Sequence, residues 1–496
     1  MTLEELIKIC NPVDISGDEP YAIRNLQQDS RLVKDDDLFI AVRGLRTDGH
    51  DFIEDAIFRG ASVIVCEEPY YTDDKGVSVI EVEETRPLLG ELAQAFHGYP
   101  ADKLTTIGIT GTNGKTTVAT LTWQILQKIG IKTGLLGTVR KYYGTEESES
   151  RLTTADPIEI AGDLKKMVDA GCSTVSMEIS SHALDQQRTS GINWDVAVFT
   201  NLSHDHLDYH KDFDHYASAK KKLFDSLNDN AWAIVNFDDP RGPFMIEDCA
   251  SKIIDFSFQK NSSIHCKILE SGEQGSLIQI DDIKVETPLP GRFNAYNVTE
   301  AFLTCTALGY DAQLISRAIK DCPGADGRLE KVTIDSDKGD KPTIFVDYAH
   351  TPDALKNAAV ALSEVKQKQR PLLILFGCGG DRDTTKRPEM AEIAEQYADK
   401  IIVTSDNPRS EDPEKIIRDI EKGFSANAVW ESIPSREEAI KHIIQEAPAD
   451  GIILIAGKGH ETYQEIKGKR IHFDDREVAR QALQKLNTNP KNEEGK

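Results

Sequence analysis

The stretch LTTIGITGTNGKTT (104–117) decides the fold of the middle of this chain. An apolar, β-branched run ends in a glycine-rich turn, and a helical spacing of apolar residues follows it at Val118, Leu121, Ile125 and Ile129. A strand, a glycine turn and a helix in this order can close backbone N–H groups around phosphate oxygens. A glycine turn beside a surface lysine is the simpler alternative.

In the phosphate-binding interpretation, Lys115 supplies a cation and the Thr116 hydroxyl can ligate Mg²⁺. The general pattern requires a glycine where Ile109 stands, and the chain offers Gly108 and Gly111 instead. The loop therefore departs from the general pattern but keeps its strand–loop–helix setting.

Alternating strands and helices extend outward from this loop in both directions. FHGYPADK (96–103) is typical of a linker, and CPGADGRLEK (322–331) marks a second break before another series of short apolar strands. Such alternation predicts parallel sheets. We expect an α/β protein with three domains: an N-terminal domain at 1–98, a central P-loop-type ATPase domain with a mostly parallel sheet at 99–330, and a C-terminal Rossmann-like, doubly wound domain at 331–496.

Composition excludes several classes of protein. The formal net charge is −25, with 58 basic against 83 acidic residues, which argues against nucleic acid as a partner. No apolar run approaches the roughly 20 residues of a membrane span, and MTLEELIKIC (1–10) lacks a basic segment leading into an apolar one. We therefore expect a cytoplasmic protein without membrane insertion, and a monomer.

The loop G-x-x-GTNGKTT resembles the nucleotide loop of the Mur ligase family, which also includes folylpolyglutamate synthetase and cyanophycin synthetase. The resemblance extends over nearly the whole chain. It implies an ATP-driven ligase that phosphorylates a carboxylate and then forms an amide. It also implies that the loop binds ATP and that Lys115 is catalytic, the loop residues being Gly111, Thr112, Asn113, Gly114, Lys115, Thr116 and Thr117.

Two further residues are candidates for holding Mg²⁺. Glu178 follows an apolar segment in SMEISSH, and His206 lies in TNLSHDHLDYH. On the residues alone, such a histidine is more often structural than a ligand. The resemblance implies that Glu178 and His206 are catalytic and ligate Mg²⁺, together with Thr116 and a carbamylated Lys220.

Of the three lysines in HYASAKKKLF (215–224), helical spacing places only Lys220 on the face that also carries Tyr216, Leu223, Phe224 and Leu227. Burial lowers the pKa of a lysine, and only the neutral amine reacts with CO₂. A lysine whose stem is buried and whose ammonium reaches water is the alternative. By resemblance to the family's Y-x-x-AK run, Lys220 is carbamylated, catalytic and in contact with the precursor.

The resemblance implies further ATP contacts. Asn294 and Asn297 would lie by the adenine, although capping and turn chemistry suits asparagine equally. Arg328 would reach the phosphates, but the usual Pro-Gly-Arg is replaced here by PGADGR, so the path of this loop differs. Asp347 and His350, in FVDYAHTPDAL, end a strand, as functional groups of open α/β sheets do.

The nucleotide-linked precursor is expected to bind in three places. QDSRLVKDDDLFIAVRG (28–44) and TDGHDF (47–52) resemble a uridine-diphosphate-binding block, with Ser30 as the best contact. LTTADP and SSHALDQQR resemble segments that contact the sugar and peptide, through Thr153, Thr154, Ser181, Gln186 and Arg188. Taken without the family, each is an ordinary loop residue.

Three C-terminal strings follow predicted strands and should therefore meet at one sheet edge: FGCGGDRDTTKRP (376–388), SDNPRSEDP (405–413) and IAGKGHETYQ (455–464). The resemblance implies meso-diaminopimelate as the amino acid that is added. This compound differs from lysine by a second carboxylate, and a guanidinium such as that of Arg409 suits that carboxylate. A surface ion pair of Arg409 with Glu411 or Asp412 is the alternative. By resemblance, the other groups of the amino acid contact Arg382, Asp406, Asn407, Gly457 and Glu461.

Together these resemblances imply ATP- and Mg²⁺-dependent addition of meso-2,6-diaminopimelate to UDP-N-acetylmuramoyl-L-alanyl-D-glutamate, through an acyl phosphate, in peptidoglycan synthesis. The alternatives are the L-lysine-adding homologue and a nucleotide switch without ligase activity.

Overall fold

The computed structural model describes residues 1–17, 23–44, 47–74, 76–334, 341–366 and 370–488. Tertiary contacts divide the chain into two compact units. The first consists of Met1–His265 with Glu300–Asp311, and the second of Cys266–Thr299 with Ala312–Lys496.

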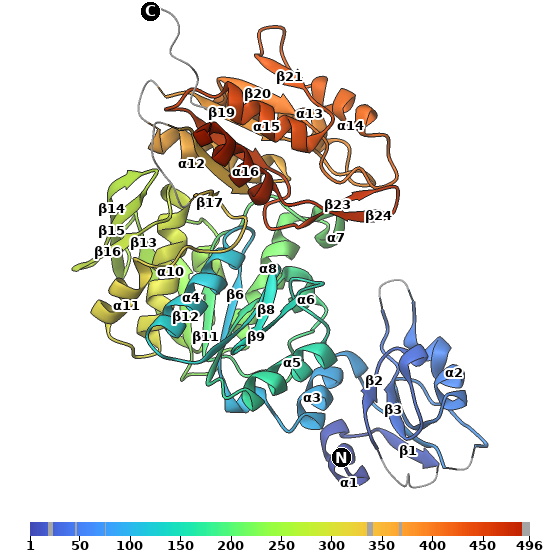
Figure 1. The fold of residues 1–496 in the computed structure, drawn as a ribbon. Coiled ribbons are helices and arrows are strands. Elements are labelled where there is room, and N and C mark those ends of the chain that lie inside the picture. The colour runs from blue at the N-terminus through green and yellow to red at the C-terminus, as the bar shows by residue number, and fades with distance from the viewer. Residues whose placement is uncertain (18–22, 45–46, 75, 335–340, 367–369, 489–496) are drawn as a thin grey trace, which may run out of the picture. The chain divides into compact units, whose positions relative to one another are not determined.

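Over its described residues, the N-terminal part of the first unit contains one sheet and three α-helices. Figure 1 shows these elements at the blue end of the chain. Its elements are α1 (Leu3–Cys10), β1 (Asp14–Gly17), β2 (Leu26–Gln27), β3 (Asp37–Ile40), α2 (Ile53–Phe58), β4 (Ala61–Cys66), β5 (Ser78–Glu81) and α3 (Thr85–Phe96). The strand order is β1-β5-β4-β3-β2, and only β1 runs antiparallel to its neighbour. Every residue of β4 is buried, as expected for a central strand covered on both faces.

The rest of the first unit is built on a mostly parallel sheet. Its strands are β6 (Thr105–Thr110), β7 (Thr133–Leu136), β8 (Arg140–Tyr143), β9 (Glu146–Glu149), β10 (Thr174–Glu178), β11 (Val196–Phe199), β12 (Trp232–Asn236) and β13 (Lys252–Ser257). Its helices are α4 (Lys115–Lys128), α5 (Pro157–Asp169), α6 (Ser181–Asp185), α7 (Leu207–His210), α8 (Phe213–Asp225) and α9 (Gly242–Met245). The order β13-β12-β11-β6-β10-β7-β8-β9 places β6, which leads into the glycine loop, in the middle.

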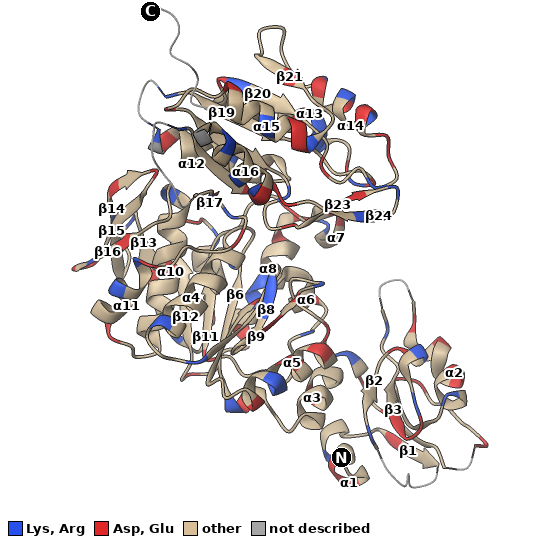
Figure 2. Ribbon diagram, in the orientation of Figure 1, with Lys and Arg blue, Asp and Glu red and all other residues tan. Residues whose placement is uncertain are grey.

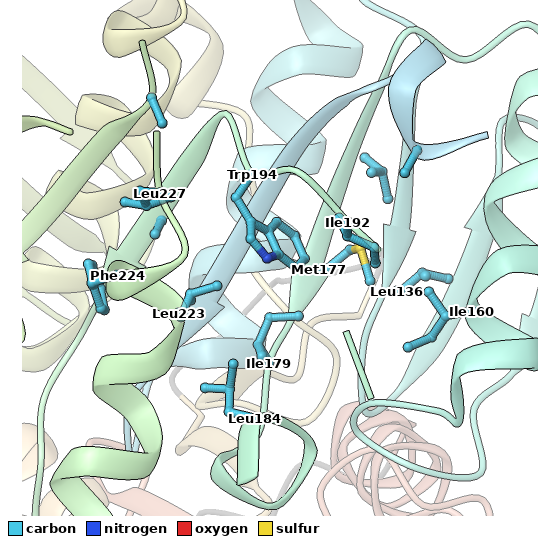
Figure 3. Close-up of a cluster of buried hydrophobic side chains, with 14 of the residues drawn as sticks. Leu136, Ile160, Met177, Ile179, Leu184, Ile192, Trp194, Leu223, Phe224 and Leu227 are labelled. Carbon is cyan, nitrogen blue, oxygen red and sulfur yellow. The ribbon is translucent and has the colours of Figure 1, made fainter. Parts of the chain in front are cut away.

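Helices cover both faces of this sheet. On one face, a Cβ added at Gly108 of β6 would lie 3.1 Å from Trp194 and 3.3 Å from Leu223 of α8, so glycine permits close packing there. On the opposite face, the Ser176 hydroxyl of β10 donates to the Ala119 carbonyl of α4 at 3.0 Å. Figure 3 shows Trp194 and Leu223 in the core on the first face, with Met177, Ile179 and Leu184 nearby.

The second unit combines an antiparallel ladder with a doubly wound sheet. The ladder and the helices after it are β14 (Ile264–Gly272), β15 (Gly275–Ile280), β16 (Ile283–Thr287), α10 (Arg292–Ala307) and α11 (Ala312–Ile319). The doubly wound part contains β17 (Glu330–Lys331), β18 (Thr343–Asp347), α12 (Pro352–Val365), β19 (Leu372–Phe376), α13 (Lys386–Tyr397), β20 (Lys400–Val403), α14 (Pro413–Glu421), β21 (Trp430–Ser432), α15 (Arg436–Glu446), β22 (Ile452–Ala456), β23 (Tyr463–Ile466), β24 (Lys469–His472) and α16 (Asp475–Thr488). Strand β14 and helix α10 continue from one unit into the other.

Two hydrophobic clusters enclose the doubly wound sheet, whose order is β17-β18-β22-β19-β20-β21. In β19, Leu372 and Ile374 point into the cluster that contains Leu355 of α12, whereas Leu373 and Leu375 point into the cluster on the other face. The five neighbouring strands β18, β22, β19, β20 and β21 are parallel. The predicted α/β class and the C-terminal Rossmann-like architecture are therefore confirmed.

The antiparallel strands were not predicted. Strands β8 and β9 extend one edge of the central sheet, and β14 to β16 form a ladder in which buried and partly exposed residues alternate, as along β15. Such strands carry a weaker apolar signal because one face meets solvent. The hairpin of β23 and β24 was likewise not expected.

Acidic and basic residues are interspersed over the described elements (Figure 2). Since 83 acidic residues face 58 basic ones, any site for an anionic ligand has to be made locally. Among the helices that the structure describes, none is both long and apolar enough to cross a membrane.

Candidate active site

The glycine loop, residues 111–114, connects β6 to α4 in the first unit. Gly111 and Gly114 have φ angles of 148° and 90°, and a Cβ at Gly111 would collide with the Thr200 hydroxyl. Lys115 folds back over the loop and donates to the carbonyls of Gly111 and Thr112, each at 2.9 Å. An ammonium is thereby held at the N-terminus of a helix, where backbone N–H groups also favour anions.

Glu178 ends β10 beside the first turn of α4. Its buried carboxylate accepts hydrogen bonds from the Thr116 hydroxyl at 2.8 Å and from the Thr138 N–H at 2.7 Å. Hydroxyl and carboxylate oxygens are ligands that Mg²⁺ prefers, so Thr116 and Glu178 fit such an ion. No cluster of three His, Cys, Asp or Glu side chains suited to a metal occurs in the described part of the chain, so Mg²⁺ would need further ligands.

Lys220 lies on the buried face of α8, as its helical spacing predicts. The side chain is 1% exposed, and Nζ donates to the Gly111 carbonyl at 2.8 Å. Burial, followed by repulsion from Lys115, lowers the pKa of Lys220 well below its usual value. The alternative of an ammonium that reaches water is therefore wrong. Lys221, whose side chain is 15% exposed, pairs with Asp225, and the exposed Lys222 pairs with Asp185.

Aromatic and imidazole rings connect α7 to the glycine loop. His206, with φ 53°, lies 6.2 Å from the Tyr216 ring, and the Tyr216 hydroxyl is 3.1 Å from Thr112 Oγ1. Partial desolvation, followed by repulsion from Lys115 and Lys220, lowers the pKa of His206, whose side chain is 47% exposed. A neutral imidazole near the loop suits metal ligation.

The predicted sugar and peptide contacts gather beside Glu178. Thr154 donates to the Glu178 carbonyl at 2.8 Å, and Arg188 Nη1 donates to the Thr154 carbonyl at 2.9 Å. The Arg188 guanidinium also donates to Gln186 Oε1, at 2.7 and 3.1 Å. Thr153 joins the group through Thr138, the two hydroxyls lying 3.1 Å apart.

Two neighbouring cavities in the first unit extend this group toward the N-terminal sheet. Gln186 and Arg188 line a cavity of about 420 Å³, and Ser30 lines one of about 930 Å³. Residues such as Gln28 and Asp156 line both cavities. The predicted uridine-diphosphate block and the predicted peptide contacts therefore border two cavities that share lining residues.

The DYAH segment lies at the carboxyl end of β18 in the second unit. Asp347 accepts hydrogen bonds from Leu329 N–H at 2.7 Å and Ala349 N–H at 2.8 Å, and burial raises its pKa. The Arg328 guanidinium lies 4.8 Å from the centre of the Tyr348 ring. The altered loop thus brings Arg328 to the end of β18.

His350 follows the same strand. Its Nδ1 lies 2.8 Å from the Tyr348 carbonyl, and its side chain is exposed. In α10, Asn294 donates to the Pro290 carbonyl at 2.8 Å, and Asn297 donates to Asn294 Oδ1 at 3.2 Å. Both asparagine side chains are therefore used in local hydrogen bonds at the start of the helix.

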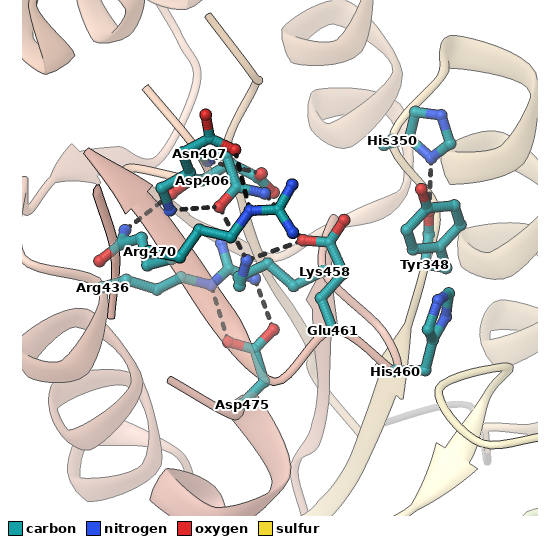
Figure 4. Close-up of polar contacts among 12 residues, drawn as sticks. Tyr348, His350, Asp406, Asn407, Arg436, Lys458, His460, Glu461, Arg470 and Asp475 are labelled. Atoms are coloured by element: carbon teal, nitrogen blue, oxygen red, sulfur yellow. Dashed lines mark hydrogen bonds and ion pairs between the residues drawn. The ribbon is translucent and has the colours of Figure 1, made fainter. Parts of the chain in front are cut away.

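The acceptor strings meet at the carboxyl edge of the doubly wound sheet, as predicted (Figure 4). Asn407 Nδ2 donates to Glu461 Oε2 at 2.8 Å, which joins the loop after β20 to the loop after β22. A Cβ at Gly457 would lie 2.5 Å from Asp406 Oδ2, so glycine leaves room for that carboxylate. Asp406 Oδ2 is buried and has no hydrogen-bond partner among the described residues.

Arg409 reaches from this edge into the loop after β19. Its Nη1 donates to the Gly380 carbonyl at 2.7 Å, and a Cβ at Gly379 would touch both Arg409 and Arg382. Glu411 pairs with Arg387 at 2.8 Å, and Asp412 approaches Arg418, so the alternative surface ion pair of Arg409 is not formed among the described residues.

Comparison with known proteins agrees with this geometry. The profile described as "Mur ligase family, catalytic domain" matches residues 22–97, the Mur ligase middle domain matches 109–305, and the glutamate ligase domain matches 327–459. UDP-N-acetylmuramoyl-L-alanyl-D-glutamate--2,6-diaminopimelate ligase from Phocaeicola vulgatus is 42% identical over 97% of this chain and 99% of its own length. The chain belongs to the Mur ligase family.

Further Mur ligases resemble it over most of its length. The 2,6-diaminopimelate ligase of Geobacillus kaustophilus is 44% identical over 92% of this chain and 94% of its own. A solved structure of a ligase of the same name is 32% identical, with a TM-score of 0.69, over 97% of this chain and 99% of that one. The MurF ligase from Thermotoga maritima in complex with ADP, at 18% identity and a TM-score of 0.61 over 93% and 98%, supports the fold alone.

Sequence reasoning missed several polar residues of this Mur ligase site. His210 lies 2.9 Å from the Ser181 hydroxyl, and Arg43 and Arg86 line the cavity that also contains Arg188. In the second unit, Lys458 and Arg436 are fully buried beside the acceptor loops. Lys458 lies inside the string IAGKGHETYQ (455–464) quoted above. Nothing in the sequence around Arg436 indicated a role, because its partners lie far away in sequence.

Proposed function

We propose that this chain is the Mur ligase that adds meso-2,6-diaminopimelate to UDP-N-acetylmuramoyl-L-alanyl-D-glutamate, with ATP, in peptidoglycan synthesis. The observation that carries the proposal is the similarity to ligases of this name, at 40–44% identity over 92–98% of the chain. We assign residues 1–98 to the precursor nucleotide, 99–330 to ATP and 331–496 to the amino acid. The protein acts as a cytoplasmic monomer.

In this reaction the D-glutamyl γ-carboxylate attacks the γ-phosphorus of ATP, giving an acyl phosphate and ADP. The glycine loop holds the phosphates through its N–H groups, and Lys115 offsets the negative charge on the transferring group. Thr116, Glu178 and His206 would hold Mg²⁺, which when bound neutralises phosphate charge. Lys220 acts as its carbamate beside them, since its enclosed amine is suited to react with CO₂.

The precursor is held along the two cavities of the first unit. Ser30 contacts the uridine diphosphate, and Thr153, Thr154, Ser181, Gln186 and Arg188 contact the sugar and peptide. The further ATP contacts in this proposal are Asn294, Asn297, Arg328, Asp347 and His350. These assignments are supported by the burial of Ser30, Thr154, Ser181, Asn294, Asn297 and Asp347, and by hydrogen bonds such as that from Arg188 to the Thr154 carbonyl.

The acceptor amine attacks the carbonyl carbon of the acyl phosphate, loses a proton, and phosphate leaves as the amide forms. Asp406, Asn407, Gly457 and Glu461 bind the ammonium and carboxylate of the reacting end. Arg382 contacts the same groups as these four residues. Arg409 binds the second carboxylate, which lysine lacks, because a guanidinium recognises a carboxylate by charge-assisted hydrogen bonds.

ADP release with ATP, Mg²⁺ and the UDP precursor tests the proposal, with meso-diaminopimelate and L-lysine offered separately. Mass spectrometry of the product then shows which amino acid is attached. Turnover with meso-diaminopimelate alone is expected. Turnover with lysine alone would reassign the acceptor, and ADP release independent of both substrates would indicate a nucleotide switch.

A further inference from the structure

Lys458, directly after Gly457, is a buried cation that no other part of the proposed mechanism uses. It is 0% exposed, and its Nζ donates to Glu461 Oε2 at 2.9 Å and to Asn407 Oδ1 at 3.1 Å (Figure 4). The ammonium also lies 5.4 Å from the centre of the Tyr463 ring. A buried ammonium is costly unless it is paired, so these contacts fix its position.

The contacts determine which way the Asn407 amide faces. Asn407 Oδ1 accepts from Lys458 and from the Glu465 N–H at 2.9 Å, while Nδ2 donates to Glu461 Oε2 at 2.8 Å. Reversing the amide would place its NH₂ group against two donors and its oxygen against a carboxylate. Lys458 therefore stabilises one of the two amide orientations.

The same ammonium fixes the Glu461 carboxylate. Oε2 accepts from both Lys458 and Asn407, and no donor among the described residues reaches Oε1. The carboxylate thus keeps one oxygen available for a ligand while the other is held in place.

The strand ends beneath this group are held independently. The Arg436 guanidinium forms two hydrogen bonds to Asp475, at 2.7 and 2.8 Å, and donates to the Ala456 carbonyl at 2.9 Å. Because α15 and α16 thereby hold the backbone at the end of β22, Lys458 is needed for the side chains of the two loops rather than for the path of the strand.

We propose that Lys458 is a positioning residue for the acceptor amino acid. It orients the Asn407 amide and the Glu461 carboxylate, which bind the acceptor, without contacting the acceptor itself. The inference rests on the proposed function, because it takes the loops after β20 and β22 as the acceptor site.

The test is the variant Lys458→Met in the full-length protein, which keeps the length of the side chain and removes the ammonium. We expect the KM for meso-diaminopimelate to rise about tenfold or more, as for loss of one charged hydrogen bond. The KM values for ATP and for the UDP precursor should stay within about twofold, since those sites keep their side chains. Lys458→Arg keeps a cationic donor, so its KM for meso-diaminopimelate should lie between those of the wild type and of Lys458→Met. This variant provides the test if Lys458→Met does not fold.

A double-mutant cycle with Glu461→Gln separates positioning from general destabilisation. If Lys458 acts through Glu461, removing it should raise the KM for meso-diaminopimelate less in Glu461→Gln than in the wild type. Independent, multiplying effects would overturn the proposal.

Arg370→Met provides a matched control. Arg370 forms a largely buried ion pair with Glu273 and contacts the Asp450 carbonyl, at the amino ends of β19 and β22. Its loss should lower Tm and leave the KM for meso-diaminopimelate unchanged. Lys458→Met behaving in the same way would show a structural role only. Wild-type protein inactive with both amino acids would instead refute the proposed function.

Discussion

The amine of Lys220 is enclosed by protein and lies 2.8 Å from the Gly111 carbonyl, so it is well placed to act at the glycine loop. We predict that Lys220→Ala lowers turnover on the order of a hundredfold, as for loss of one preorganised charged group. Added formate or acetate should restore part of the activity, because a small carboxylate fits the space left by a carbamate. ADP release at saturating substrates, with and without formate, measures both effects.

Lys221→Ala is the control for that variant. Its ammonium pairs with Asp225 and the Glu247 carbonyl, away from the glycine loop. Activity close to that of the wild type is expected. A fully active Lys220→Ala enzyme would remove Lys220 from the mechanism.

Arg409 is the residue on which we propose that the choice of acceptor depends. Arg409→Ala keeps a Cβ at the positive φ of 51°, so it removes the guanidinium and its methylene stem without asking a new backbone conformation of this position. We predict weaker binding of meso-diaminopimelate by about 1.5–3 kcal/mol, roughly ten- to hundredfold, as for a charged hydrogen bond. Calorimetric titration with the amino acid and with ATP checks this, and an equal loss of ATP affinity would contradict it.

At the scale of elements, the segment made of β6, the glycine loop and α4 requires a residue without a side chain at position 111. We predict that Gly111→Ala lowers ATP affinity at least about tenfold, because a Cβ would collide with Thr200 and displace the loop N–H groups. Gly130→Ala is the matched control: Gly130 also has a positive φ, of 89°, but a Cβ there meets nothing within 4 Å. Nucleotide titration of both variants should show a loss only for Gly111→Ala.

The parallel elements were predictable because buried strands such as β19 and β22 are continuous apolar runs between helices. That pattern also placed Asp347, Asn407 and Glu461 at strand ends, where the structure brings them to one edge. The ladder of β14 to β16 was not predictable, since its half-exposed strands alternate apolar and polar residues without a clear boundary.

Contacts between residues far apart in the sequence limited how much of the candidate site could be predicted. Arg436 and Asp475 form a buried ion pair 39 residues apart, and Lys458 contacts Asn407 across 51 residues. Nothing in the local sequence of either residue indicates these partners, because side-chain packing between elements decides them. The helix face of Lys220 was predictable by contrast, since it follows from the spacing of a single helix, although that spacing left open whether the ammonium reaches water.

For the whole molecule, the excess of 83 acidic over 58 basic residues, a net charge of −25, predicts a dependence of stability on salt. Like charges repel more strongly in the compact folded state than in the unfolded chain. Screening reaches about 8 Å at 0.15 M, so raising NaCl from about 10 to about 200 mM should raise Tm by a few degrees and then level off. Exposed ion pairs weaken in the same range, but each contributes only about 0–1 kcal/mol.

Thermal unfolding followed by circular dichroism measures the effect, and KCl at equal ionic strength should give the same rise. A Tm that falls steadily with NaCl would show that ion pairs outweigh the net charge.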